Sequence, residues 1–102
     1  MRFSTKARAT DRVFKEYARA ETPVATADGG LPAVEKFASD LKAIDLKRAP
    51  EAVHHAMARM IQAVEKNAAV HRAGGNTNAA NDDLAMARRD FVSTMDRLRG
   101  NH

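Results

Sequence analysis

Apolar residues recur every three or four positions along most of the chain, the spacing that places them on one face of an α-helix. They do not alternate with polar residues over any strand-length run, so strands are not predicted. The pattern instead predicts helices over about residues 4–20, 32–47, 50–73 and 79–99. Their apolar stripes are Phe3, Ala7, Thr10, Phe14 and Tyr17; Val34, Phe37, Leu41 and Ile44; Val53, Met57, Met60 and Val64; and Leu84, Ala87, Phe91, Met95 and Leu98.

Helix-breaking residues separate these segments. Pro23 is predicted to end the first helix before it, which leaves residues 22–30 as a loop. Pro50 separates the second helix from the third, and Gly74 is a typical stop for the third. Since helices joined by short connections pack antiparallel, we expect an all-α, up-and-down antiparallel bundle of four helices that forms one domain over residues 1–102. The pattern leaves open whether the first helix packs within this bundle or between chains.

The composition excludes several classes of protein. The chain has 102 residues and no cysteine, so disulfides and thiolate metal sites are excluded. No segment reaches the roughly 18 apolar residues that a membrane-spanning helix needs. The compartment stays open: an extracytoplasmic (periplasmic) location is favoured if a signal or anchor precedes Met1, and a cytoplasmic one otherwise.

Positive charge is concentrated in the first helical segment, although the net charge of the whole chain is only +4. The basic stripe of this segment recurs at helical spacing opposite its apolar stripe and consists of Arg8, Arg12, Lys15 and Arg19. Such a stripe is either an ordinary solvated face or a binding surface for a protein partner or an anionic membrane. Nucleic acid is disfavoured as a partner, because the rest of the chain is neutral and aromatic residues are not interleaved with the basic ones.

The same helix carries aromatic residues that bear on its partners. If the apolar stripe is left uncovered, Phe3, Phe14 and Tyr17 are candidates for self-association between chains. The chain contains no glycine-rich phosphate loop and no nucleophile spaced from a plausible base, so enzymatic activity is not expected. We therefore predict a non-enzymatic structural or protein-interaction domain, with the basic first helix as its contact surface.

Histidines and methionines of the third helix raise the alternative of a cofactor site. A chelating pair on one helix needs side chains three or four residues apart. His54 and His55 are adjacent and diverge by about 100°, and His71 lies about 25 Å further along the helix. We therefore expect no metal and no cofactor, with the methionines as core residues. The alternative function is a small haem-, metal- or ligand-binding bundle, and a second alternative is a polyanion binder. Candidate ligands in such a bundle are His71, Met57, Met60, Met86 and Met95.

The run LKAIDLKRAPEAVHHAMARMIQAV, residues 41–64, resembles a helical hairpin of small uncharacterised secreted or membrane-anchored proteins of Gram-negative bacteria. The resemblance is carried by Leu41, Ile44, Asp45, Pro50, Val53 and Ala56. Such proteins often have a cysteine and an aromatic residue where this chain has Ala49 and Val64. The resemblance covers about a quarter of the chain. It implies an extracytoplasmic helical domain of a bacterium and transfers no functional residue.

Overall fold

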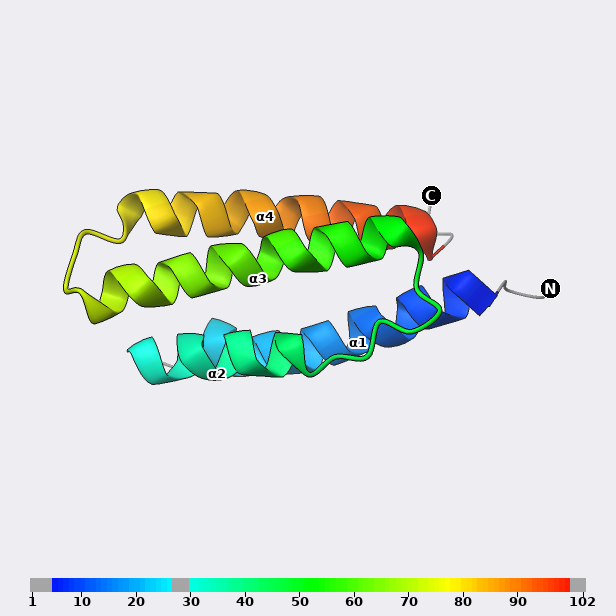
Figure 1. Cartoon of the computed structure of the whole chain (residues 1–102), viewed down its shortest axis with the longest axis horizontal. Coiled ribbons are helices and arrows are strands. Elements are labelled where there is room, and N and C mark those ends of the chain that lie inside the picture. The colour runs from blue at the N-terminus through cyan, green and yellow to red at the C-terminus, as the bar shows by residue number, and fades with distance from the viewer. Residues whose placement is uncertain (1–4, 27–29, 100–102) are drawn as a thin grey trace.

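The structure is an all-α bundle, as the apolar pattern predicts. The computed structural model describes residues 5–26 and 30–99, with side chains described for 5–22 and 30–99. These residues form α1 (Thr5–Thr26), α2 (Gly30–Lys42), α3 (Glu51–Arg72) and α4 (Asn78–Leu98), and no strand occurs among them. The four helices run alternately in opposite directions along a molecule of 50 × 21 × 19 Å (Figure 1).

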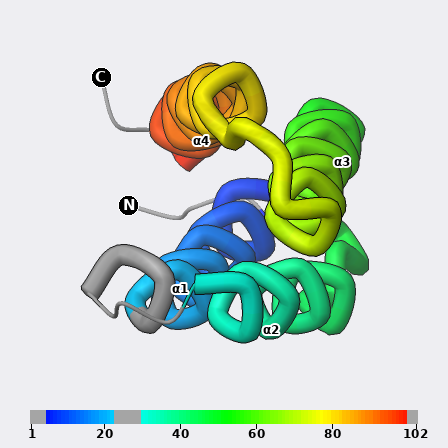
Figure 2. Tube along the Cα trace, turned by 90° about the vertical axis from the view of Figure 1, so that its left-hand side faces the viewer, coloured from blue at the N-terminus to red at the C-terminus, as the bar shows by residue number. Residues whose placement is uncertain are grey.

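The first helix belongs to the bundle, which answers the question that its sequence leaves open. α3 packs against α2 and α4, and α1 packs against the same two helices. Viewed end-on, the four helices surround a common axis (Figure 2). The α1 residues Thr10, Val13 and Tyr17 are accordingly buried within the bundle rather than left for contact with another chain.

Aromatic side chains from three helices meet in the middle of the core. The Tyr17 ring of α1 lies 4.4 Å from the ring of Phe91 on α4 and 5.9 Å from that of Phe37 on α2, measured between centroids. All three side chains are buried. Tilted rings at these distances attract each other beyond their hydrophobic burial, so they fix α1 against both neighbours.

The predicted apolar stripes of α2, α3 and α4 form most of the core, with Leu84 and Leu98 only partly buried at its edge. The stripe of α1 differs from the prediction. Val13 is completely buried, whereas Phe14 lies at the edge of the core under the guanidinium of Arg99. The buried face of α1 is thus rotated about the helix axis relative to the predicted one, from Phe14 toward Val13. Thr10 also lies in the core, where its hydroxyl donates to the Lys6 carbonyl at 2.7 Å and leaves no polar group unsatisfied.

The predicted end of the first helix is wrong. α1 continues through Pro23 to Thr26, so residues 22–26 of the predicted loop are helical and Gly30 already begins α2; residues 27–29 lie outside the described chain. A proline removes one backbone donor from a helix but does not unwind the turn that follows when other contacts support it. Here the Glu21 carboxylate is held by Arg88 of α4, and the Thr22 hydroxyl donates to the Ala18 carbonyl at 2.8 Å.

The predicted end of the second helix is also wrong, because α2 stops at Lys42 and residues 43–50 form the α2–α3 link. Ile44 continues the apolar spacing and is buried, but its backbone is no longer helical. The Asp45 carboxylate instead accepts the Lys47 backbone N–H at 2.8 Å, a local bond that competes with helix formation. The predicted α2–α3 hairpin is confirmed, although its connection is longer than expected.

Candidate interaction surface

The basic stripe of α1 separates into paired and unpaired residues. The Arg12 guanidinium donates at 2.7 Å to the Glu16 carboxylate and at 2.7 Å to the Asp45 carbonyl. Lys15 pairs with the Asp11 carboxylate at 2.9 Å. Arg8 and Arg19 are exposed and make no ion pair or hydrogen bond with the described residues. The stripe is thus not one continuous positive surface, and only part of its charge is free to meet a partner.

Two members of the stripe combine with the α2–α3 link to form a compact group, which we call the basic cluster: Arg8, Arg12, Lys47 and Arg48. These residues line one open depression of about 510 Å³ on the surface, together with Thr5, Ala9 and Asp45. Lys47 and Arg48 are exposed, and neither side chain is paired with another described residue. The cluster therefore brings three cations that form no ion pair among the described residues together with Arg12, which is already held in place.

The backbone of the α2–α3 link determines this arrangement. The Arg12 guanidinium holds the Asp45 carbonyl, and the Asp45 side chain holds the backbone of Lys47. The next residue, Arg48, has a φ of 68°, in the left-handed region that side chains other than glycine and asparagine rarely adopt. The link is thus fixed by hydrogen bonds at one end and strained where it presents Arg48.

Sequence reasoning finds half of this cluster. Arg8 and Arg12 belong to the predicted stripe, whereas Lys47 falls at the end of the helix predicted over residues 32–47 and Arg48 in the short connection that follows it. The available signal is the pair of basic residues directly before Ala49 and Pro50, at a point where the chain must reverse. The remaining stripe residues lie elsewhere: Arg19 faces a separate depression of mixed charge between α1 and α2, and Lys15 is neutralised by Asp11.

The residues predicted for self-association are not available as a group. Tyr17 is only 1% exposed, because it is packed between Phe37 and Phe91, so it cannot contribute to a contact between chains. Phe14 is partly buried, with the Arg99 guanidinium 4.4 Å above its ring. Phe3 lies outside the described residues. Self-association was predicted for the case in which the apolar stripe of α1 is exposed, and at Tyr17 this stripe is buried in the bundle.

A polar network at the edge of the core joins α1 to α4. The Tyr17 hydroxyl donates to the Glu21 carboxylate, and Arg88 donates to the same carboxylate from Nε at 2.6 Å and from Nη2 at 2.9 Å. Burial would raise the pKa of Glu21, but the hydrogen bonds from Arg88 and Tyr17 outweigh it and hold this pKa below its ordinary value. Burial, followed by the bond to Glu21, raises the pKa of Tyr17. The charges of Glu21 and Arg88 cancel, and the polar groups of the network bond to each other. Such an arrangement is typical of residues that hold two helices together.

The histidines and methionines do not converge on a common site. His54 and His55 are exposed, and His71 is partly buried in the last turn of α3. Met57, Met60 and Met95 fill the core, each at most 1% exposed, while Met86 lies on the surface. Within the described residues no group of three or more histidines and carboxylates has the spacing of a metal site. The haem- or metal-binding alternative therefore finds no support in how these side chains are arranged.

Comparison with known proteins adds no relative: no family model, curated protein or solved structure matches the chain. The resemblance of residues 41–64 to a bacterial hairpin stays a prediction. None of the helices in the described chain is both long and apolar enough to cross a membrane. What the fold and surface define is a four-helix bundle with a filled core and a compact basic cluster on its outside.

Proposed function

We propose that the protein is a non-enzymatic helical interaction domain whose basic cluster binds an acidic segment of a partner protein. The observation that carries this proposal is the meeting of Arg8, Lys47 and Arg48 around one depression, where none of the three pairs with another residue in the part of the chain that the structure describes. A guanidinium presents a planar fork of donors that matches a carboxylate, and such charge-assisted bonds are roughly twice as strong as neutral ones. Holding Arg12 in place beforehand reduces the entropy lost when a ligand binds.

The surroundings of the cluster favour a protein over a membrane or a nucleic acid. An amphipathic helix binds a membrane surface through an exposed apolar face. The apolar residues Val13 and Tyr17 of α1 are instead buried within the bundle. A nucleic acid needs an extended basic track. On α2 and α3, four of the five lysines and arginines already form ion pairs, as in Lys42 with Glu65 and Arg72 with Glu35, and Lys66 is the exception among the described residues.

The test is a titration of the protein with a fluorescent peptide rich in glutamate. Arg8→Glu/Arg48→Glu should weaken binding at least tenfold, because each lost charged bond is worth about 1.5–3 kcal/mol and 1.4 kcal/mol is a factor of ten. The matched control is Arg19→Glu/Lys66→Glu, which changes the net charge equally at two exposed residues outside the cluster. The control should retain affinity to within about twofold. Circular dichroism verifies that both variants fold.

Several outcomes would reject the proposal. Equal weakening by the two double variants would mean that net charge, and not the cluster, attracts the peptide. Absence of peptide binding at low salt, where screening is weakest, would remove the acidic segment as the ligand. Binding of anionic vesicles or duplex DNA that needs the cluster, without binding of the peptide, would replace this proposal with the polyanion alternative.

A further inference from the structure

A second unneutralised surface lies on the outer side of α4. We call it the α4 stripe, and it consists of Met86, Arg89, Ser93 and Arg97. These residues follow each other at intervals of three or four, so they share one helix face, and all four are exposed. None of them takes part in an ion pair or a side-chain hydrogen bond with the described residues. This face is therefore free of both the core and the neighbouring helices.

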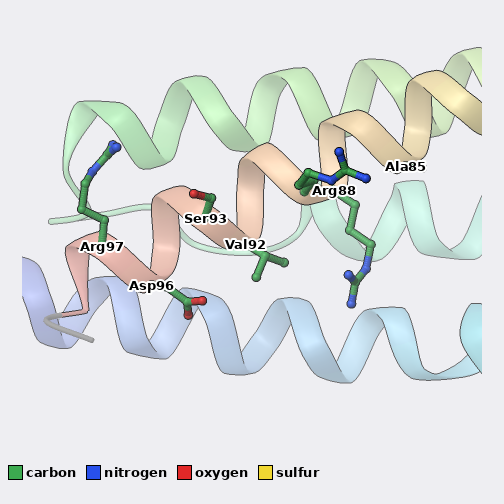
Figure 3. Close-up of a pocket in the computed structure, with 7 residues that line it drawn as sticks. Ala85, Arg88, Val92, Ser93, Asp96 and Arg97 are labelled. Carbon is green, nitrogen blue, oxygen red and sulfur yellow. The ribbon is translucent and has the colours of Figure 1, made fainter. Parts of the chain in front are cut away.

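Three residues of the stripe, Arg89, Ser93 and Arg97, line a depression of about 660 Å³ that is open to solvent. Val92 and Asp96 project from α4 toward α1, whereas Ser93 and Arg97 project to the opposite side (Figure 3). The other charges along this depression are already engaged: Arg88 holds Glu21 of α1, and Asp96 lies 3.5 Å from Arg99. The charges left to a ligand are the guanidinium groups of Arg89 and Arg97.

The stripe also contains an exposed apolar residue. Among the described residues, Met86 is the large hydrophobic side chain left in solvent, with 57% of its surface exposed. Methionine is flexible and polarizable, so it adapts to the side chains of a partner helix. An apolar contact beside unpaired arginines is typical of protein interfaces, where arginine and methionine are enriched.

We propose that the α4 stripe is a second protein-binding surface, occupied by an acidic amphipathic helix that lies antiparallel to α4. Arg89 and Arg97 are eight residues apart, which is about 12 Å along the helix axis. Two carboxylates separated by seven or eight residues on a partner helix repeat this distance on one face. Acids favour the N-terminal half of a helix because of its dipole, and antiparallel packing places that half beside Arg97. This surface does not depend on the basic cluster.

The test uses isotope-labelled full-length chain and a synthetic helical peptide of about five turns, with two glutamates on one face around a leucine. Amide NMR should show shifts confined to the segment of α4 from Met86 to Arg97. Arg89→Glu/Arg97→Glu should weaken binding at least tenfold, by the loss of two charged contacts. Two controls should behave differently: Arg19→Glu/Lys66→Glu should bind normally, and a peptide with its glutamates moved to opposite faces should bind at least tenfold more weakly.

The result also separates this surface from the basic cluster. Shifts at Arg8, Lys47 and Arg48 in place of α4 would overturn the α4 proposal and leave the proposed function standing. No shift anywhere, or equal binding of the rearranged peptide, would likewise overturn it. Retained peptide binding by Arg8→Glu/Arg48→Glu, with α4 shifts unchanged, would establish that the two surfaces act independently.

Discussion

At the scale of single residues, Arg48 combines strain with exposed charge. Its left-handed backbone costs roughly 1–2 kcal/mol for a residue with a Cβ and little for glycine. We expect Arg48→Gly to raise the free energy of unfolding by about 1 kcal/mol, which is about 4–8 °C in melting temperature. The same change removes a cation from the basic cluster and should weaken the binding of a glutamate-rich peptide.

The combination of higher stability and weaker binding is what the functional interpretation of Arg48 requires. Urea unfolding and peptide titration of the same variant measure the two effects. Lys47→Gly serves as the control, since Lys47 is not among the positive-φ residues and glycine there should lower stability. Stability of Arg48→Gly equal to or below that of the wild type would contradict the strain argument.

Asn67 is the buried amide of the α3–α4 interface, only 2% exposed, and its Nδ2 donates to Asn81 Oδ1 at 2.7 Å. Removing the acceptor in Asn81→Ala leaves a buried donor without a partner, which costs about 1–3 kcal/mol. We expect the urea midpoint to fall accordingly, whereas Asn78→Ala, at an exposed asparagine of the same helix, should change stability by less than about 0.5 kcal/mol. Adding Asn67→Leu to Asn81→Ala should recover much of the loss; no recovery would contradict this explanation.

At the scale of helices, the joint between α1 and α4 depends on the charge of Glu21. Its pKa is lowered in the folded state, so its contribution to stability is present above the ordinary value of 4.5 and is lost as pH falls through the lower folded value. Arg88→Met removes the main cause of that lowering. We expect it to cost about 1 kcal/mol at neutral pH, a modest figure because the pair is partly exposed, and to lose less further stability below pH 4.5 than the wild type does.

The matched control for this joint is Arg89→Met, because Arg89 is the neighbouring residue, equally basic and without an ion pair among the described residues. Urea midpoints measured at neutral pH and at several values below 4.5 compare the three proteins. If the urea midpoints of Arg88→Met and Arg89→Met depended on pH in the same way, the bond between Arg88 and Glu21 would not couple the charge of Glu21 to folding.

The helices themselves were predictable from apolar spacing, and the bounds of α3 and α4 agree with the prediction to within one residue, whereas the ends of α1 and α2 were not predictable. Spacing reports which residues face a core, and Val34, Phe37, Leu41 and Ile44 all do so. It does not report whether the backbone is still helical, and Ile44 reaches the core from the α2–α3 link. Similarly, Pro23 is a local signal that was outweighed by the tertiary bond between Glu21 and Arg88.

The candidate surface was only half predictable for a related physical reason. Arg8 and Arg12 are close in sequence and on one helix face, so periodicity finds them. Lys47 and Arg48 join them only because the α2–α3 link folds back beside the first turns of α1, and no local rule gives that distance. The sequence also does not show which arginine is already bonded, because this depends on the tertiary structure. Arg12 donates to the Asp45 carbonyl, far away in sequence, and Arg8 does not.

At the scale of the whole molecule, the positive charge is polarised toward one end. The start of α1, the α2–α3 link and the end of α4 lie together at the same end of the bundle (Figure 1). The basic residues of these segments are Lys6, Arg8, Arg12, Lys15, Lys47, Arg48, Arg97 and Arg99. The acids are fewer, even with the first residue of α3 included: Asp11, Glu16, Asp45, Glu51 and Asp96. Under the proposed function, this asymmetry would steer an acidic partner toward the end where the basic cluster and Arg97 are located.

The bundle as a whole should unfold in one cooperative step that includes α1. Tyr17 is the one tyrosine of the chain, which has no tryptophan, and it is buried where α1 meets α2 and α4. Its fluorescence therefore reports the docking of α1, whereas far-ultraviolet circular dichroism reports all four helices. We expect the two signals to follow the same urea curve, because detaching α1 would expose Phe37 and Phe91 to water, at about 1.5–3 kcal/mol for each large apolar side chain fully exposed. A fluorescence transition at lower urea would show that α1 leaves the bundle first and is held less firmly than this core requires.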